Sequence, residues 1–283
     1  KTKEGLVRMC ACRGTAGFAH VSCLAEQAKI LFAEAEENNL DWGAKNPRFR
    51  RWDTCNECKQ YYHGVVKCAL GWGCWKTYLG RPETDQVRGM AMNVLGGGLS
   101  EADNYEDAST VLEAELAMLR RLGESEAAIL GTRSNLAITY EALGRHEEAL
   151  SMQQGVYSGY LRLKGEEDEN TLREANNYAE SLNDLKRFEE AKTLLRRTMP
   201  VVRRVFGEND DLTLRMRSIY AQTLYEDPGA TLDDLREAVT TLEDADPIAR
   251  RVLGSSNPVA TAIEFFLRQA RAALQVAQRR PVV

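Results

Sequence analysis

Hydrophobic and polar residues alternate along much of the chain with the period of an α-helix. Over residues 125–143 and 146–163, the apolar side chains form one stripe along each predicted helix. Gly144 and Gly165 follow these stretches, and glycine is the residue that most readily ends a helix. A single pair of helices cannot bury both stripes. The pattern therefore predicts that several pairs stack on one another.

A second, longer period of 42 residues connects these pairs. When the sequence is displaced by 42 residues, the asparagine and alanine at 135–137 fall on those at 177–179. The Arg-x-Glu-Glu-Ala words at 145–149 and 187–191 coincide in the same way. One step further back, Asn93 takes the position of the first asparagine. So many coincidences at one period predict an array of repeated helical pairs.

The fourth pair is longer than the others. Five additional residues around Pro228 stretch its period to 47, and Thr231 is the predicted cap of a helix over 232–252. A last helix over 257–278 should close the array. The predicted fold is all-α. It comprises an N-terminal zinc-finger-like module at 1–64, a connecting helix at 65–82, four repeats at 83–254 and a capping helix at 255–283.

The repeats also carry a resemblance to a known family. Residues 134–150, with Gly165 and Thr171 in register, resemble the 42-residue tetratricopeptide repeats of kinesin light chains. The resemblance covers roughly 84–254. It implies a right-handed superhelix whose concave face is lined by the first helix of each pair and binds an extended protein segment or peptide.

In the kinesin light chain repeats, an asparagine on the first helix often hydrogen-bonds the ligand backbone. The matching residues here are Asn93, Asn135 and Asn177, whereas Ile219 occupies that position in the fourth repeat. The resemblance thus implies a ladder of asparagines that binds a partner. The alternative is that these asparagines form structural hydrogen bonds between helices.

Four arginines are expected on or near the same face: Arg133, Arg173, Arg215 and Arg217. Their charge favours an acidic ligand. The alternative is that they are only solvated, as most arginines on helical arrays are.

All seven cysteines lie between Cys10 and Cys74. An odd number at short spacings indicates metal binding in a reducing compartment rather than a disulfide framework. The candidate ligands come as three close pairs: Cys10 with Cys12, His20 with Cys23, and Cys55 with Cys58. Zinc takes four thiolate or imidazole ligands, which two such pairs can supply.

The words at 5–15, 20–24 and 55–59 resemble the RING-CH (RING-variant) zinc finger. The resemblance implies that the Cys10 and Cys12 pair completes one zinc site with the Cys55 and Cys58 pair. The His20 and Cys23 pair would be half of a second site, whose other two cysteines are expected before Lys1.

RING-CH fingers belong to ubiquitin ligases, so the resemblance also implies docking of a ubiquitin-conjugating enzyme. Three features depart from the family. The first cysteine pair of the finger is absent from this chain, Gln27 stands where a tryptophan is usual, and a predicted helix at 24–39 lengthens the loop between the cysteine pairs. The alternatives are a structural zinc knot that packs on the repeats, and buried cysteines without metal.

Other function classes find no support. A net charge of -5 without a tract of lysines and arginines gives no basis for nucleic-acid binding. The longest apolar run, 65–75, is too short to cross a membrane. No lysine follows the glycines at 96–98 as a phosphate-binding loop requires, and three histidines are too few and scattered for a catalytic triad.

The sequence therefore predicts an adaptor whose repeats select a protein partner, with ubiquitin transfer as a further possibility for the finger. The alternative is a non-catalytic scaffold or a structural subunit of a larger complex with a degenerate finger. Cytoplasm is the default location, and an organelle reached through a removed targeting segment is the other expectation.

Overall fold

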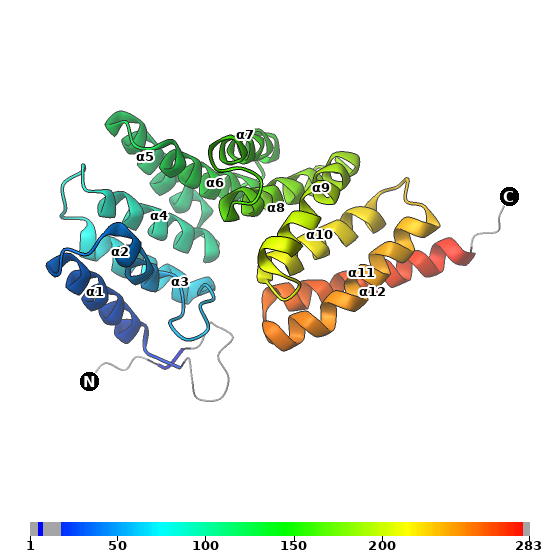
Figure 1. Cartoon of the computed structure of the whole chain (residues 1–283), viewed down its shortest axis with the longest axis horizontal. Helices are drawn as coiled ribbons and strands as arrows, with labels where there is room; N and C mark the ends of the chain where they lie inside the picture. Colours follow the sequence, from blue (N-terminus) through cyan, green and yellow to red (C-terminus); the bar gives the residue numbers. More distant parts are fainter. Residues whose placement is uncertain (1–4, 8–17, 280–283) are drawn as a thin grey trace. The chain divides into compact units, whose positions relative to one another are not determined.

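The computed structural model describes residues 5–7 and 18–279. Over these residues the chain is helical, and its only β-type pairings are two isolated antiparallel bridges, Val7 with Ala19 and Thr54 with Tyr61 (Figure 1). The chain divides into two compact units, Lys1–Arg145 and His146–Val283. The all-α prediction is confirmed for the described part.

In its described residues, the first unit contains six α-helices and one 3-10 helix: α1 (Val21–Glu37), α2 (Trp42–Phe49), η1 (Arg50–Trp52), α3 (Gly64–Tyr78), α4 (Gln86–Glu101), α5 (Tyr105–Leu122) and α6 (Glu126–Ala142). The second unit contains α7 (His146–Lys164), α8 (Glu169–Asp184), α9 (Phe188–Phe206), α10 (Asp211–Glu226), α11 (Leu232–Val252) and α12 (Pro258–Arg279). None of the helices in the described ranges combines the length and apolarity needed to cross a membrane.

The helix ends are where the sequence placed them. Helices α6 and α7 match the predicted stretches to within about a residue at either end. Gly144 and Gly165 have φ angles of 76° and 86°, a left-handed backbone that glycine adopts without strain. At the start of α11, the Thr231 hydroxyl accepts a hydrogen bond from Asp234 N at 3.1 Å, and the Asp234 carboxylate accepts one from Thr231 N at 2.9 Å. This reciprocal cap confirms the predicted start of α11.

The segment between Cys23 and Cys55 holds one more helix than predicted. Helix α2 follows Asp41, whose side chain accepts a hydrogen bond from Ala44 N at 2.9 Å. It leads into η1 and delivers Phe49 and Trp52 to an aromatic cluster with Tyr78 of α3. A short helix with a proline inside shows little apolar periodicity, so the aspartate cap was its only local signal.

Helices α3 and α4 approach each other through glycines. A Cβ atom on Gly71 would lie 3.0 Å from Val94 O, and one on Gly98 would lie 2.9 Å from Lys67 O. Both distances are shorter than a side chain tolerates against backbone. Gly98 therefore serves the packing of α4 on α3, whereas Gly96 faces Leu112 of α5, 2.6 Å from where its Cβ atom would lie. The predicted connecting helix, now α3, lies directly against the first repeat.

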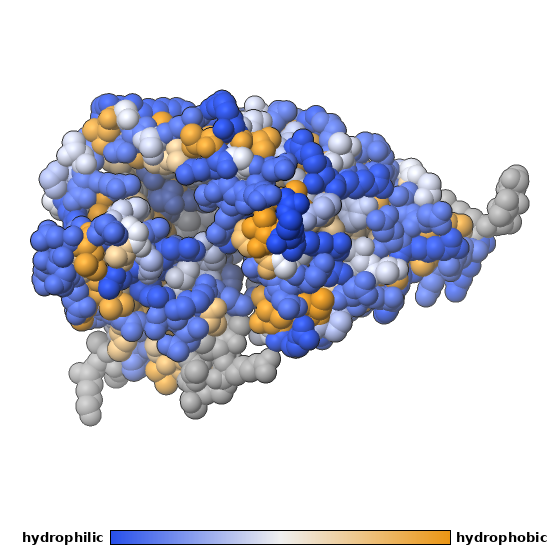
Figure 2. Space-filling model, viewed as in Figure 1, coloured by the Kyte–Doolittle hydropathy of each residue, from blue (hydrophilic) through white to orange (hydrophobic). Residues whose placement is uncertain are grey.

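The second unit is built on small residues at the repeat period. Ala179 of α8 and Ala221 of α10 are both completely buried. They lie in one core with apolar side chains from α9, α11 and α12. On the face of the molecule shown in Figure 2, hydrophobic side chains occur as separate small patches among hydrophilic ones. The repeats thus bury their apolar stripes against neighbouring helices, as the pattern predicts.

Candidate functional site

Two of the predicted asparagines are hydrogen-bonded to each other. Asn135 Nδ2 on α6 donates to Asn93 Oδ1 on α4 at 2.9 Å. Asn93 Nδ2 donates in turn to Glu115 Oε2 on α5 at 3.2 Å, and the Thr132 hydroxyl donates to Glu115 Oε1 at 3.0 Å. These bonds join three helices of the first unit, as the structural alternative expects. A role of these asparagines in binding a partner stays a prediction.

Glu115, which sequence reasoning did not single out, is the centre of this network. Its side chain is only 3% exposed. Burial raises the pKa of the carboxyl group to about 8, although the hydrogen bonds from Asn93 and Thr132 act in the opposite direction. The only sequence signal was a glutamate on the apolar face of α5, where a charged residue is unusual.

Glu115 lines a cavity of about 260 Å³ within the first unit. Apolar side chains of α4 and α5, including Met90 and Met118, line it as well, together with residues of the α2–η1 segment. Another lining residue is Asp53, whose Oδ1 atom is buried and has no hydrogen-bond partner. Burial raises the pKa of Asp53 to about 6, against the opposing charges of Lys67 and Arg50. The buried carboxyl group of Glu115 and that of Asp53, whose Oδ1 atom is buried, therefore line one cavity.

The third predicted asparagine, Asn177, lies on α8 in the second unit. Its Nδ2 is 3.4 Å from Glu174 Oε2, and its Oδ1 accepts a hydrogen bond from Asn176 Nδ2 at 3.5 Å. Ile219, its counterpart on α10, is buried. Asn177 is therefore already engaged by neighbours on its own helix.

A cavity of about 230 Å³ lies next to these positions, between α8, α10 and α12. Asn176 and Ser218 line it, and both side chains are buried. Asn176 Oδ1 and Ser218 Oγ have no hydrogen-bond partner. Apolar side chains, among them Val259 and Phe266, complete the lining.

Asn176 and Ser218 are also 42 residues apart, one position before the predicted ladder. The repeat period therefore places both on successive first helices, although their residue types differ. It did not reveal which of two adjacent polar positions lacks a partner.

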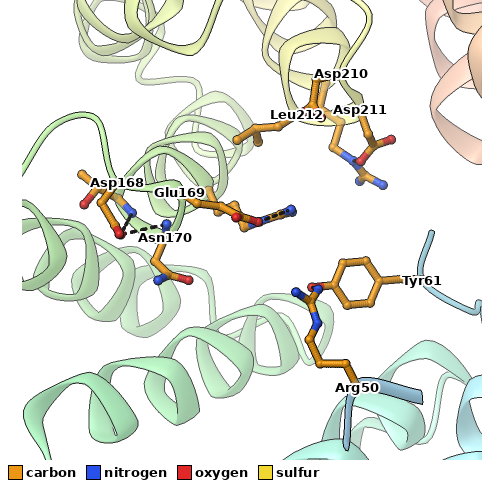
Figure 3. A network of polar contacts seen from close by, with 11 residues as sticks. Arg50, Tyr61, Asp168, Glu169, Asn170, Asp210, Asp211 and Leu212 are labelled. Atoms are coloured by element: carbon orange, nitrogen blue, oxygen red, sulfur yellow. Dashed lines mark hydrogen bonds and ion pairs between the residues drawn. The ribbon is translucent and has the colours of Figure 1, made fainter. Parts of the chain in front are cut away.

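The arginines predicted to favour an acidic ligand are largely paired within the chain. Arg173 lies 2.8 Å from Glu169, and Arg215 lies 2.7 Å from Asp211. Figure 3 shows Glu169 and Asp211 at the starts of α8 and α10, next to Asp168 and Asp210. Arg217 is buried, with Glu208 Oε2 at 3.3 Å and a hydrogen bond to Thr241 O.

Arg133 differs from these three. Burial lowers the pKa of its guanidinium group, and the neighbouring charge of Arg120 adds to this effect. Binding of an acidic ligand by these four arginines stays a prediction.

Of the predicted zinc ligands, Cys10 and Cys12 lie outside the described residues. His20 Nδ1 and Cys23 Sγ are 3.8 Å apart. Cys55 and Cys58 lie in a tight hairpin, in which Cys55 N donates to Gln60 O at 2.8 Å and Lys59 N donates to Cys55 O at 3.0 Å.

The two parts of the module meet in one apolar cluster. Cys55 belongs to this cluster, and both Cys58 and Val7 pack against it. Val7, which precedes Cys10 by three residues in the sequence, therefore packs against the same cluster as Cys58. Within residues 5–7 and 18–279, no group of three or more potential metal ligands is gathered. The zinc site stays a prediction.

Comparisons with known proteins support the repeat fold. The family model described as "Tetratricopeptide repeat" matches residues 129–168 and 171–211. A comparison with curated protein sequences finds no match. Among solved structures, the nearly identical TPR-like repeats of a kinesin light chain from Podosopora anserina share 19% identity, with a TM-score of 0.55, covering 70% of this chain and 90% of that chain.

Two further structures are similar in fold. BtubC (BKLC) from P. vanneervenii has 16% identity and a TM-score of 0.54, covering 92% of this chain and 87% of its own. A Rap protein solved with Competence and Sporulation Factor has 12% identity and a TM-score of 0.52, covering 91% and 72%. At these identities the likeness concerns the fold alone. Residues 129–168 and 171–211 thus form tetratricopeptide repeats, in a chain with the fold of helical-repeat proteins.

Proposed function

We propose that this chain is a protein-interaction adaptor whose tetratricopeptide repeats bind an extended segment of a partner protein. The observation that carries the proposal is the pair of buried, unpartnered polar atoms, Asn176 Oδ1 and Ser218 Oγ, in the cavity of the second unit. Buried polar atoms are nearly always hydrogen-bonded, and leaving one unbonded costs about 1–3 kcal/mol. The backbone groups of a bound peptide would satisfy both atoms.

The surroundings of these atoms suit such a ligand. Val259 and Phe266 offer apolar contact for side chains, while Asn176 and Ser218 recur once per repeat on successive first helices. A regular series of polar groups can follow the regular backbone of an extended chain. The Rap protein of similar fold was solved in complex with Competence and Sporulation Factor, so a fold of this kind does accommodate a ligand. A non-catalytic scaffold in a larger complex would use the same cavity to bind its partner.

The test is a selection of short random peptides on the full chain, followed by affinity measurements. Replacing both Asn176→Ala and Ser218→Ala should weaken binding of a selected peptide by about tenfold or more, because two hydrogen bonds of about 0.5–1.5 kcal/mol each are lost. Ser151→Ala, at an exposed position of α7, is the control and should leave affinity unchanged. Unchanged affinity in a fully helical double variant would exclude this cavity as the binding site.

We also propose that the N-terminal module holds zinc through the Cys55 and Cys58 pair, together with Cys10 and Cys12. The support is the RING-CH resemblance, the tight hairpin at Cys55, and the packing of Val7 against the same cluster. Bound zinc would supply a cross-link between the two segments.

Ubiquitin transfer is the finer reading of the same resemblance. It would require a docking surface for a conjugating enzyme, and Gln27 stands where the family uses a tryptophan. We therefore expect this chain to fail to discharge ubiquitin from conjugating enzymes. Discharge above the level of a Cys55→Ser variant would show that the module is an active ligase.

A further inference from the structure

The cavity of the first unit has a carboxyl group without a cation beside it. Glu115 is almost fully buried, and the groups that hydrogen-bond it, Asn93 and Thr132, are both neutral. An ionised carboxylate can accept about four hydrogen bonds, and these two neighbours provide only two. Glu115 therefore retains acceptor capacity on the side that lines the cavity.

A second carboxyl group lines the same cavity. Asp53 Oδ1 is buried and unpartnered, which is rare enough in native proteins to need an explanation. The two cations that act on Asp53 are engaged elsewhere. Lys67 is paired with Glu101 at 3.3 Å, and Arg50 donates a hydrogen bond to the Tyr61 hydroxyl at 2.7 Å (Figure 3).

Charge and size narrow the class of ligand. The charged residues that line the cavity are Asp53, Glu83, Asp85, Glu115, Glu124 and Arg50, so acids outnumber bases. Glu83 is paired with Arg121, and Asp85 with Arg81. The volume of about 260 Å³ is below the ~300–1,000 Å³ of pockets for drug-sized ligands. It suits a single long side chain.

We propose that this cavity binds one lysine or arginine side chain of a protein partner, with its aliphatic stem against Met90 and Met118 and its charge beside Glu115 and Asp53. The proposal rests on the proposed function only in that the cation is carried by a protein. Long basic side chains commonly bury their stems in apolar surroundings while their charge finds a polar partner. This basic ligand has the opposite charge to the acidic ligand that we expected from the four arginines in the sequence.

Binding of a cation should be coupled to loss of a proton. The free carboxyl group of Glu115 has a pKa of about 8 and is mostly protonated at neutral pH, whereas a bound cation favours its charged form. Affinity for arginine, which stays charged throughout, should therefore rise between pH 6.5 and 8.5 and level off above that. Burial raises the pKa of Asp53 to about 6, so this group ionises mostly below that range. The other charged groups of the lining are Glu83, Asp85, Glu124 and Arg50.

The test uses the full chain with ¹³C-labelled methionine methyl groups. The probes are Nα-acetyl-arginine methylamide and its neutral norleucine counterpart. The arginine probe should shift the Met90 and Met118 resonances saturably, and the norleucine probe should not. Glu115→Gln should weaken the arginine probe about tenfold or more, as for loss of a charge-assisted hydrogen bond, and should abolish the pH dependence.

Glu106→Gln, at an exposed position of the same helix, is the matched control and should bind as the wild type does. Asp53→Asn is the second variant if Glu115→Gln fails to fold. Equal binding of both probes, shifts at Met199 and Met216 alone, or no saturable shift would overturn the proposal. If Asn176→Ala with Ser218→Ala leaves peptide affinity unchanged while the arginine response is intact, the proposed function alone is refuted. If that double variant weakens peptide binding but the arginine response is absent, this inference alone is refuted.

Discussion

At the scale of single residues, Glu115 shows how the repeat interior holds a titratable group. Its carboxyl group is shielded from water by α4, α5 and α6, and the protein meets it with neutral hydrogen-bond donors. Such a group is stable in its protonated form and costly in its charged form. It thereby links the stability of the first unit to pH.

The stability of the first unit should decrease as the pH rises. The pKa of Glu115 rises from an ordinary 4.5 to about 8 on folding, so the folded state holds a proton that the unfolded state has lost between these values. Its contribution is fully present below pH 4.5 and is lost as pH rises to about 8, at up to about 1.4 kcal/mol per pH unit.

We therefore expect the urea midpoint of the wild type to fall, relative to that of Glu115→Gln, between pH 5.5 and pH 8.5. Circular dichroism on both proteins measures this difference. A difference that is constant with pH would show that Glu115 is ionised in the folded protein at all these values.

The sequence predicted which residues lie on the first helices but not how they are bonded. Asn93, Asn135 and Asn177 are where the repeat places them. Their hydrogen-bond partners do not follow from the repeat, however: Asn93 donates to Glu115 on another helix, and Asn177 donates to Glu174 about one turn away on its own helix. A periodic pattern fixes the face of a helix, whereas a hydrogen bond depends on the rotamers of both partners. For the same reason the unpartnered Oδ1 atom of Asn176 escaped notice.

At the scale of elements, the close contact between α3 and α4 depends on glycines, which have no side chain to keep the two backbones apart. A Cβ atom on Gly98 would meet backbone atoms of Lys67 and Cys68, whereas one on the neighbouring Gly97 would meet only Lys67 Cε, at 4.0 Å. Alanine substitutions at Gly98 and Gly97 therefore distinguish the loss of close helix packing from the gain in helix propensity.

Gly98→Ala should destabilise the first unit by about 1–3 kcal/mol, because backbone atoms cannot move aside easily. Gly97→Ala should instead stabilise it by about 0.5–1 kcal/mol, because alanine restricts the unfolded chain and favours helix. Thermal unfolding of the two variants measures the contrast. Equal effects would mean that α3 and α4 do not pack as closely as described.

The cysteines allow a similarly matched comparison. Cys68 of α3 packs against a buried cluster of Leu95, Leu99 and Ala108. Burial raises the pKa of its thiol, which disfavours the thiolate form that metals bind. Cys55→Ser should release zinc from purified protein, whereas Cys68→Ser should retain about one zinc per chain. Zinc content is measured by mass spectrometry of the metal. A well-folded wild type without zinc would refute the metal proposal.

Elements with clear caps and stripes were predicted from the sequence, and those held by tertiary contacts were not. Helix α11 has both a capping box and a strong apolar stripe. Helix α2 has eight residues and depends on the packing of Phe49 among aromatic side chains. A helix this short is unstable by itself, so its formation reflects neighbours that are distant in the sequence.

At the scale of the whole molecule, the repeat period is what connects sequence, fold and proposed function. The tetratricopeptide match covers most of α6 and α8 and all of α7 and α9, and the solved structures of similar fold extend the likeness to a larger share of the chain. Within the second unit, the same period brings Asn176 and Ser218 to one cavity. The identity of the partner depends on side chains of that cavity, which the period does not determine.

The most direct test of the adaptor proposal is hydrogen exchange of the full chain with and without a selected peptide that lacks lysine and arginine. We predict slower exchange in α8 and α10 around Asn176 and Ser218, and in α12 beside Val259, because a bound backbone would fill the cavity between these helices. Slowing confined to α7, α9 and α11 under saturating peptide, or no slowing in the second unit, would contradict the account.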